Sequence, residues 1–194
     1  MNTEEQITNY EQKTRTYKMM MLFAMVSIFM VFGGLTSAFV VSGSRPDWLE
    51  NFVLPSAFWY STLSMLLSSV GFYFAIKAIK NSNRGQATAL LLVTLMLGIT
   101  FVVLQFAGFN QIIDLGYRFV GSASTITTSF LYVLVLVHLL HLVGGFISLF
   151  IVIYNHSKQK YKPSQTLGIE LSAMYWHFMD FIWVFLFLFF YFYK

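Results

Sequence analysis

The run LSAMYWHFMDFIWVFLFLFFYFY, from Leu171 to Tyr193, decides the fold class of this chain. It is long and apolar enough to cross the hydrocarbon core of a bilayer as a helix, which takes roughly 20 residues. Two ionisable side chains, His177 and Asp180, interrupt it. Because such groups are costly to place in hydrocarbon, both must face protein, water or a partner rather than lipid tails. The run therefore predicts a membrane helix whose polar side chains point inward.

The composition of the whole chain is that of an integral membrane protein. Of 194 residues, 57% are hydrophobic and only 10% are charged, whereas soluble domains carry about 25% charged residues. There is no Cys, which excludes a disulfide, a thiolate-bound copper or iron–sulfur centre, and a thioether-attached haem. The net charge of +4 comes from basic residues scattered in loops and does not indicate a nucleic-acid partner.

Four further apolar segments precede the last one. Each is continuous rather than alternating, which favours helices over the strands of a barrel. The five predicted spans are residues 19–41, 57–76, 87–109, 126–154 and 171–193. Residues 1–18 are polar and are expected to form a cytoplasmic N-terminal tail rather than a signal peptide. We predict an all-α polytopic membrane protein in which residues 19–194 form one bundle of five transmembrane helices.

The basic residues indicate how the chain crosses the membrane. With these five spans, nine of the twelve Lys and Arg residues fall on one side. The nine are Lys13, Arg15, Lys18, Lys77, Lys80, Arg84, Lys158, Lys160 and Lys162, and the other three are Arg45, Arg118 and Lys194. Because cytoplasmic loops are enriched in Lys and Arg, we predict that the N-terminus is cytoplasmic and the C-terminus is outside.

The fourth span carries a pair of histidines. His138, His141 and Gly145 share one stripe of the helix, at spacings of three and four residues. The imidazoles could be ligands of a metal or haem, or buried side chains hydrogen-bonded to neighbouring helices or subunits. We favour packing, because haem ligands usually come from two helices, and a zinc or di-iron site would need carboxylates that these spans almost lack.

The last span repeats this pattern with His177 and Asp180, three residues apart. Trp176 and Trp183, seven residues apart, flank the pair on one face of the helix. The carboxyl group could be neutral or part of an ion pair. We favour structural packing over direct proton transfer, and we expect Asp180 to bond with His177 or with a neighbouring helix.

Polar side chains in the other spans also predict close packing. The second span is rich in small hydroxyl residues, which let helices approach closely. These residues are Ser61, Thr62, Ser64, Ser68 and Ser69. In the third span, Gln105 is a lone amide that we expect to bond across to another helix.

Four of these motifs together resemble subunit III of the haem–copper oxidases. Tyr175–Asp180, YWHFMD, with Trp183 three residues further on, resembles the Tyr-Trp-His-Phe-Val-Asp motif of that family's last helix. His138–Gly145, HLLHLVGG, resembles its His-Gly-x-His-Val-x-x-Gly element. Thr62–Ser69, TLSMLLSS, is similar to its Asn-Thr-x-x-Leu-x-x-Ser-Ser helix, and Phe32–Leu35, FGGL, to the end of its Glu-bearing helix. The order, spacing and topology of these motifs agree from about residue 20 onward.

The resemblance is to the five-span bacterial form and implies a subunit without catalytic residues, bound metal or other redox centre. It implies that the chain stabilises the catalytic subunit I of a proton-pumping terminal oxidase and supports proton uptake while oxygen is reduced to water in aerobic respiration. Implied partners are subunits I and II, which would hold haem and copper. Bound phospholipids are implied as well, and the resemblance is compatible with a larger respiratory assembly. The implied location is the bacterial inner membrane. Expected structural, lipid or subunit contacts are His138, His141, Gly145, Tyr175, Trp176, His177, Asp180, Trp183, Thr62, Ser68 and Ser69.

The chain departs from the family pattern at two carboxylates. The family's intramembrane Glu aligns with Ile28, and the Glu of its Gln-x-x-Glu-Tyr element aligns with Gly108, after Gln105. Leu139 and Ser61 replace a Gly and an Asn of the family motifs. The missing carboxylates argue against a proton relay through this chain and leave the scaffold role intact.

Two other classes of function stay open at this point. A small five-span transporter would need a polar, water-lined path at mid-membrane. A di-histidine membrane haem protein would bind haem through His138 and His141. Co-purification with a haem-bearing large subunit, together with the optical spectrum of the isolated chain, separates both from an oxidase subunit III.

Overall fold

A computed structural model of the chain describes residues 3–45, 48, 54–117, 119, 125–161 and 166–193. Its elements are α1 (Thr3–Val41), the short 3-10 helix η1 (Ser42–Ser44), α2 (Ser56–Lys80), α3 (Arg84–Asp114), α4 (Ile126–Ser157) and α5 (Leu167–Phe192). The five α-helices among these residues are long and apolar enough to cross a membrane. The predicted all-α architecture with five spans is confirmed.

The helices are longer than the apolar runs that predicted them. The largest difference is in α1, which has 39 residues and begins at Thr3 rather than Met19. At 1.5 Å per residue its length is about 58 Å, almost twice the thickness of a hydrocarbon core of about 30 Å. The residues expected as a polar tail therefore continue the first span as helix from Thr3 onward.

Local sequence explains where the middle helices begin. The side chain of Asn83 accepts a hydrogen bond from the backbone N–H of Gln86 at 3.3 Å and so caps α3. Thr125 and Thr128 form a reciprocal capping box at the start of α4. Such caps satisfy backbone N–H groups that the first helical turn leaves without partners.

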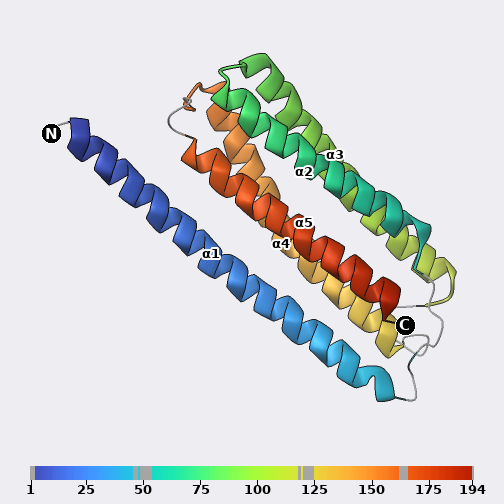
Figure 1. Ribbon diagram of the computed structural model, residues 1–194. Coiled ribbons are helices and arrows are strands. Elements are labelled where there is room, and N and C mark those ends of the chain that lie inside the picture. Colours follow the sequence, from blue (N-terminus) through green and yellow to red (C-terminus); the bar gives the residue numbers. More distant parts are fainter. Residues whose placement is uncertain are drawn as a thin grey trace.

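Successive helices run in opposite directions (Figure 1). α2 and α3 form a closely packed hairpin on one side, α4 and α5 lie in the middle, and α1 lies along the far side against α4 and α5. We call one end of the bundle the basic end: the start of α1, the α2–α3 turn, and the adjoining ends of α4 and α5. Lys18, Lys80, Arg84 and Lys158 lie there. Arg118, Lys162 and Lys194, which entered the orientation prediction, lie outside the described residues.

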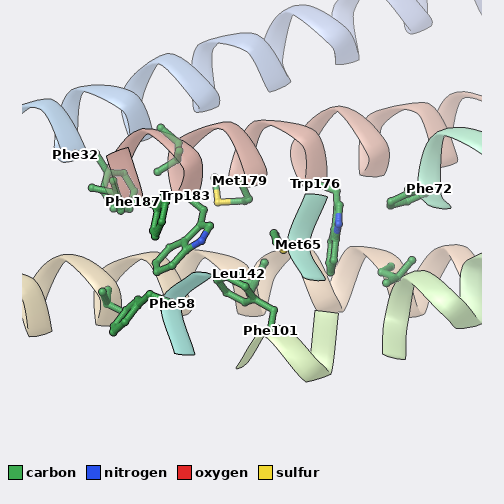
Figure 2. Packing of buried hydrophobic residues seen from close by; sticks show 14 of the residues in the cluster. Phe32, Phe58, Met65, Phe72, Phe101, Leu142, Trp176, Met179, Trp183 and Phe187 are labelled. Carbon is green, nitrogen blue, oxygen red and sulfur yellow. The ribbon is translucent and has the colours of Figure 1, made fainter. Parts of the chain in front are cut away.

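The core of the bundle is aromatic and centres on α5. Trp176, Met179 and Trp183 point from α5 toward α2, α3 and α4, as Figure 2 shows. Phe72 and Phe101 are fully buried beside them. Large apolar side chains on the outside of the bundle are exposed, as is expected where lipid rather than water is the solvent. The face of α5 that carries the sequence motif is thus the face buried in the core.

Candidate functional site

Two tryptophans of α5 donate hydrogen bonds to hydroxyl groups of α2. Trp176 Nε1 donates to Ser68 Oγ at 2.8 Å, and Trp183 Nε1 donates to Thr62 Oγ1 at 3.0 Å. Both indole rings are buried, so an unpaired N–H there would cost free energy. The earlier tryptophan, Trp176, pairs with the later hydroxyl residue, Ser68, because α2 and α5 are antiparallel. Four residues singled out in the sequence are therefore brought together at one helix interface, which we call the α2–α5 seam.

A third contact of the α2–α5 seam joins His177 to Ser69, whose hydroxyl group is hydrogen-bonded to His177 Nδ1. Asp180 lies one turn further along α5 and is 5% exposed. Ser69 also interacts with the Asp180 carboxyl group, but neither carboxyl oxygen has a partner at hydrogen-bonding geometry among the described residues. The seam thus contains one hydroxyl group that faces both a histidine and a buried acid.

The histidines of α4 lie among aromatic rings. His138 is fully buried, and its ring is 5.3 Å from that of Trp183 and 5.9 Å from that of Phe101, measured between centroids. Neither nitrogen of His138 has a hydrogen-bond partner within the described chain. His141 Nδ1 donates to the carbonyl oxygen of Val137 in its own helix at 2.8 Å. Both imidazoles therefore pack against aromatic rings of other helices, and the expected hydrogen bonds to neighbouring helices or subunits stay a prediction.

Small residues allow α5 to approach its neighbours closely. A Cβ atom at Gly145 would lie 3.3 Å from the Trp176 ring, and one at Gly98 would lie 3.0 Å from the same ring. Tyr175 donates from its hydroxyl group to the carbonyl oxygen of His141 at 2.8 Å. Gly145 and Tyr175, both predicted from the motifs, thus lie where α4 meets α5.

The positions of the two missing family carboxylates lie in different surroundings. A Cβ atom at Gly108 would lie 2.7 Å from the ring of Phe58, so this ring occupies the space beside α3. Ile28 is partly buried on α1 and packs against the hydrophobic core. Gln105, one turn before Gly108, donates from Nε2 to Ser61 Oγ at 2.8 Å, which confirms the expected bond to another helix.

An ion-pair cluster at the basic end was missed by sequence reasoning. Glu170, in the first turn of α5, accepts Lys18 Nζ from α1 at 2.8 Å and Lys80 Nζ from α2 at 2.9 Å. Thr166 Oγ1 donates to the same carboxylate at 2.9 Å. The only signal in the sequence is that all three charged residues fall near span ends on the same predicted side. Glu170 joins three helices at this end.

The residues that the structure describes hold no group of three or more His, Cys, Asp or Glu side chains placed to bind a metal ion. The seam, the two histidines of α4 and the Glu170 cluster are therefore three separate polar features. The seam and the Glu170 cluster connect helices through hydrogen bonds or ion pairs, and the seam combines a buried acid, an imidazole and a hydroxyl group.

Comparisons with known proteins place these features in a family. The family model described as cytochrome c oxidase subunit III matches residues 7–194. Cytochrome c oxidase subunit 3 of Spodoptera frugiperda is 31% identical over 126 residues, which cover 64% of this chain and 81% of the relative. Cytochrome bo(3) ubiquinol oxidase subunit 3 of Pseudomonas putida is 28% identical over 164 residues, which cover 84% of this chain and 74% of the relative.

A third relative is also bacterial. Cytochrome c oxidase subunit 3 of Bacillus sp. (strain PS3) is 29% identical over 140 residues, which cover 72% of this chain and 66% of the relative. Vertebrate relatives such as those of Papio hamadryas and Gallus gallus are matched over 46% of their own length, so the chain spans about half of those proteins.

Proposed function

Because the chain belongs to the cytochrome c oxidase subunit III family, we propose that it stabilises the catalytic subunit of a proton-pumping terminal oxidase and supports proton uptake during the reduction of oxygen to water. The observation that carries this proposal is the family match over residues 7–194. The haem and copper of such an oxidase would lie in partner subunits I and II. The bacterial relatives favour the bacterial inner membrane as the location.

The packing of the bundle supports a scaffold role. Trp176, Met179 and Trp183 occupy the centre between α2, α4 and α5, where a transporter would need a polar path (Figure 2). The hydrogen bonds of the α2–α5 seam tie these rings in place. We therefore expect contacts with other subunits and with lipid on the outer faces of the bundle, where large apolar side chains such as Phe23 and Met30 are exposed.

The surface of α1 is consistent with the proposal that the chain binds phospholipid. A pocket of about 540 Å³ lies between α1 and α5 at the basic end. Arg15, Lys18 and the acidic Glu11 line its polar side, and Met19, Leu22 and Met174 provide apolar lining. Along α1 the basic side chains are followed by apolar ones, as a phosphate headgroup of a lipid is followed by its acyl chain.

The test compares the oxidase with and without this chain. Without it, initial oxygen consumption per haem should stay near normal and then decay over repeated turnovers, and re-expression of the chain should prevent the decay. The tagged chain, purified in mild detergent, should bring a haem-bearing large subunit with it. An oxidase that is equally durable without the chain, or a tagged chain that purifies without any haem protein, would contradict the proposal.

A further inference from the structure

A pocket at the basic end reaches from the ion-paired helix ends to His177. It has a volume of about 590 Å³ and lies between α1, α2 and α5. Lys18, Lys80 and Glu170 line it, as do Ala173 and His177. The pocket is large enough for a group of water molecules, and the charged side chains of Lys18, Lys80 and Glu170 can hold water at its outer end. Water can therefore approach the imidazole of His177 from the basic end.

The titratable groups of α5 follow one face of the helix inward from this pocket. Glu170, Ala173, His177 and Asp180 are spaced by three, four and three residues, so they share a stripe. At 1.5 Å per residue, Asp180 lies about 15 Å along the axis from Glu170, which is about half of a hydrocarbon core. Ala173 leaves only a methyl group between the ion pairs and His177.

Asp180 is a buried acid without a donor. Neither carboxyl oxygen has a hydrogen-bond partner in the described part of the chain, and the hydroxyl group of Ser69, which interacts with it, is engaged with His177. An ionised carboxylate in this place would need a donor, whereas a protonated acid is itself a donor. We propose that His177, Ser69 and Asp180 form a buried proton-binding site that exchanges protons with water in the pocket between α1, α2 and α5.

The three side chains can pass one proton from the pocket to Asp180, with every proton accounted for. A proton taken from pocket water at His177 Nε2 gives an imidazolium ion. Its Nδ1–H donates a proton to Ser69 Oγ while the Ser69 hydroxyl proton passes to the Asp180 carboxylate. Asp180 is then a neutral acid, Ser69 has regained its hydroxyl proton, and His177 is a neutral imidazole. The reverse sequence returns the proton to the pocket.

The charges around the site favour a proton over a metal cation. From α1, Lys18 faces the pocket, and from α2 Tyr73, Lys77 and Lys80 do so, against the single carboxylate of Glu170. This positive mouth repels metal cations. α4 also packs against α5. The rings of its His138 and His141 lie near Phe32, and its other ionisable side chains are Tyr132, Tyr154 and His156. A proton, unlike a metal cation, can be taken from a neutral water molecule, so the positive mouth does not exclude it.

Infrared spectroscopy of the full chain in lipid nanodiscs tests the proposal. The parent should show the carbonyl band of a protonated carboxylic acid whose intensity depends on pH, and Asp180→Asn should lack this band. Asp114→Asn, at the exposed C-terminal end of α3, is the matched control and should keep it. Spectra of the parent and of Asp180→Asn that titrate identically would overturn the proposal, because the other carboxyl groups contribute equally to both. Because the chain alone carries the site, this result is independent of association with an oxidase.

The route is tested by the rate at which the Asp180 band shifts in heavy water. Ala173→Leu, which fills the pocket, and His177→Gln, which keeps an amide beside Ser69 but cannot carry a proton, should each slow the shift by about tenfold or more. Ala24→Leu, on the exposed surface of α1, should not. If the band of His177→Gln shifts as fast as that of the parent, the proposal is overturned. This outcome is decisive even if Ala173→Leu does not fold.

Discussion

Gly108 shows how one residue sets the chemistry of its surroundings. The ring of Phe58 fills the space beside it, stacks on Trp183 at 6.0 Å and 14°, and leaves no room for a longer side chain. Trp183 in turn meets Phe101 edge to face at 5.0 Å. Such aromatic contacts contribute about 0.5–1.5 kcal/mol each beyond burial. At this position an aromatic stack occupies the space into which a carboxylate of the family pattern would project.

The close approach of Phe58 predicts a penalty for any side chain at Gly108. Gly108→Ala should lower the midpoint of thermal unfolding of the detergent-solubilised chain, because overpacking a core costs about 1–3 kcal/mol. Gly33→Ala is the matched control, since a Cβ there meets nothing within 4 Å and should not lower the midpoint. A Gly108→Ala chain as stable as Gly33→Ala would contradict this account.

The hydrogen bond from Trp176 predicts a cost for removing its acceptor. Ser68→Ala leaves the buried Trp176 Nε1–H without its partner, so the free energy of unfolding should fall by about 1–3 kcal/mol. Ser157→Ala, which removes an exposed hydroxyl group bonded within its own helix, should change it by less than about 0.5 kcal/mol. Denaturant unfolding followed by tryptophan fluorescence measures both, and equal values for the two variants would refute the role of the seam.

α1 is the helix with the weakest attachment to the bundle. It contacts α4 and α5 along one face while most of its apolar side chains are exposed. At the basic end, Lys18 binds Glu170, and near the opposite end the Tyr193 hydroxyl group donates to the carbonyl oxygen of Val40 at 3.3 Å. Glu170 also binds Lys80 of α2, so one carboxylate of α5 links α1 to the α2–α3 hairpin.

This arrangement predicts that Glu170→Gln weakens the attachment of α1. The charged side chains are part-exposed, so we expect a loss of only about 0.5–1 kcal/mol in the free energy of unfolding. The parent should lose the same amount as salt is raised, whereas Glu170→Gln should be insensitive to salt. Glu11→Gln, exposed on α1, is the control. A salt dependence that survives in Glu170→Gln would show that other charges dominate.

Across the whole molecule, charge and helix direction agree. The alternating helices bring eight described basic residues from Lys13 to Lys160 to one end and leave Arg45 at the other. The Glu170 cluster and the pocket that it lines also lie at the basic end. From this asymmetry we predict that the basic end faces the cytoplasm.

Because the chain has no Cys, single cysteines report its orientation without a background. Ser82→Cys and Ser157→Cys, exposed at the basic end, should react with a membrane-impermeant thiol reagent only in inverted vesicles. Ser44→Cys, exposed beyond α1, should react only in right-side-out vesicles. Labelling with the opposite sidedness would reverse the topology.

Several features follow from sequence because they are local. The five helices, their order and their predicted orientation depend on the length of apolar runs and on loop charge, which add up residue by residue. The motif face of α5 is likewise readable, since Trp176, His177, Asp180 and Trp183 stand at helical spacing. The extension of α1 to Thr3 was not predicted, because a polar helix and a polar tail share the same composition.

Only the tertiary structure decides which residues meet. Trp176 meets Ser68, and Glu170 meets Lys18 and Lys80, because helix rotation and axial register bring together side chains that lie between 90 and 152 residues apart. The space beside Gly108 depends on Phe58 in the same way. Packing of whole helices sets these contacts, and local sequence period does not encode it. Asp180 is therefore visible in the sequence as a residue, but its burial beside Ser69 and His177 is decided only in the folded bundle.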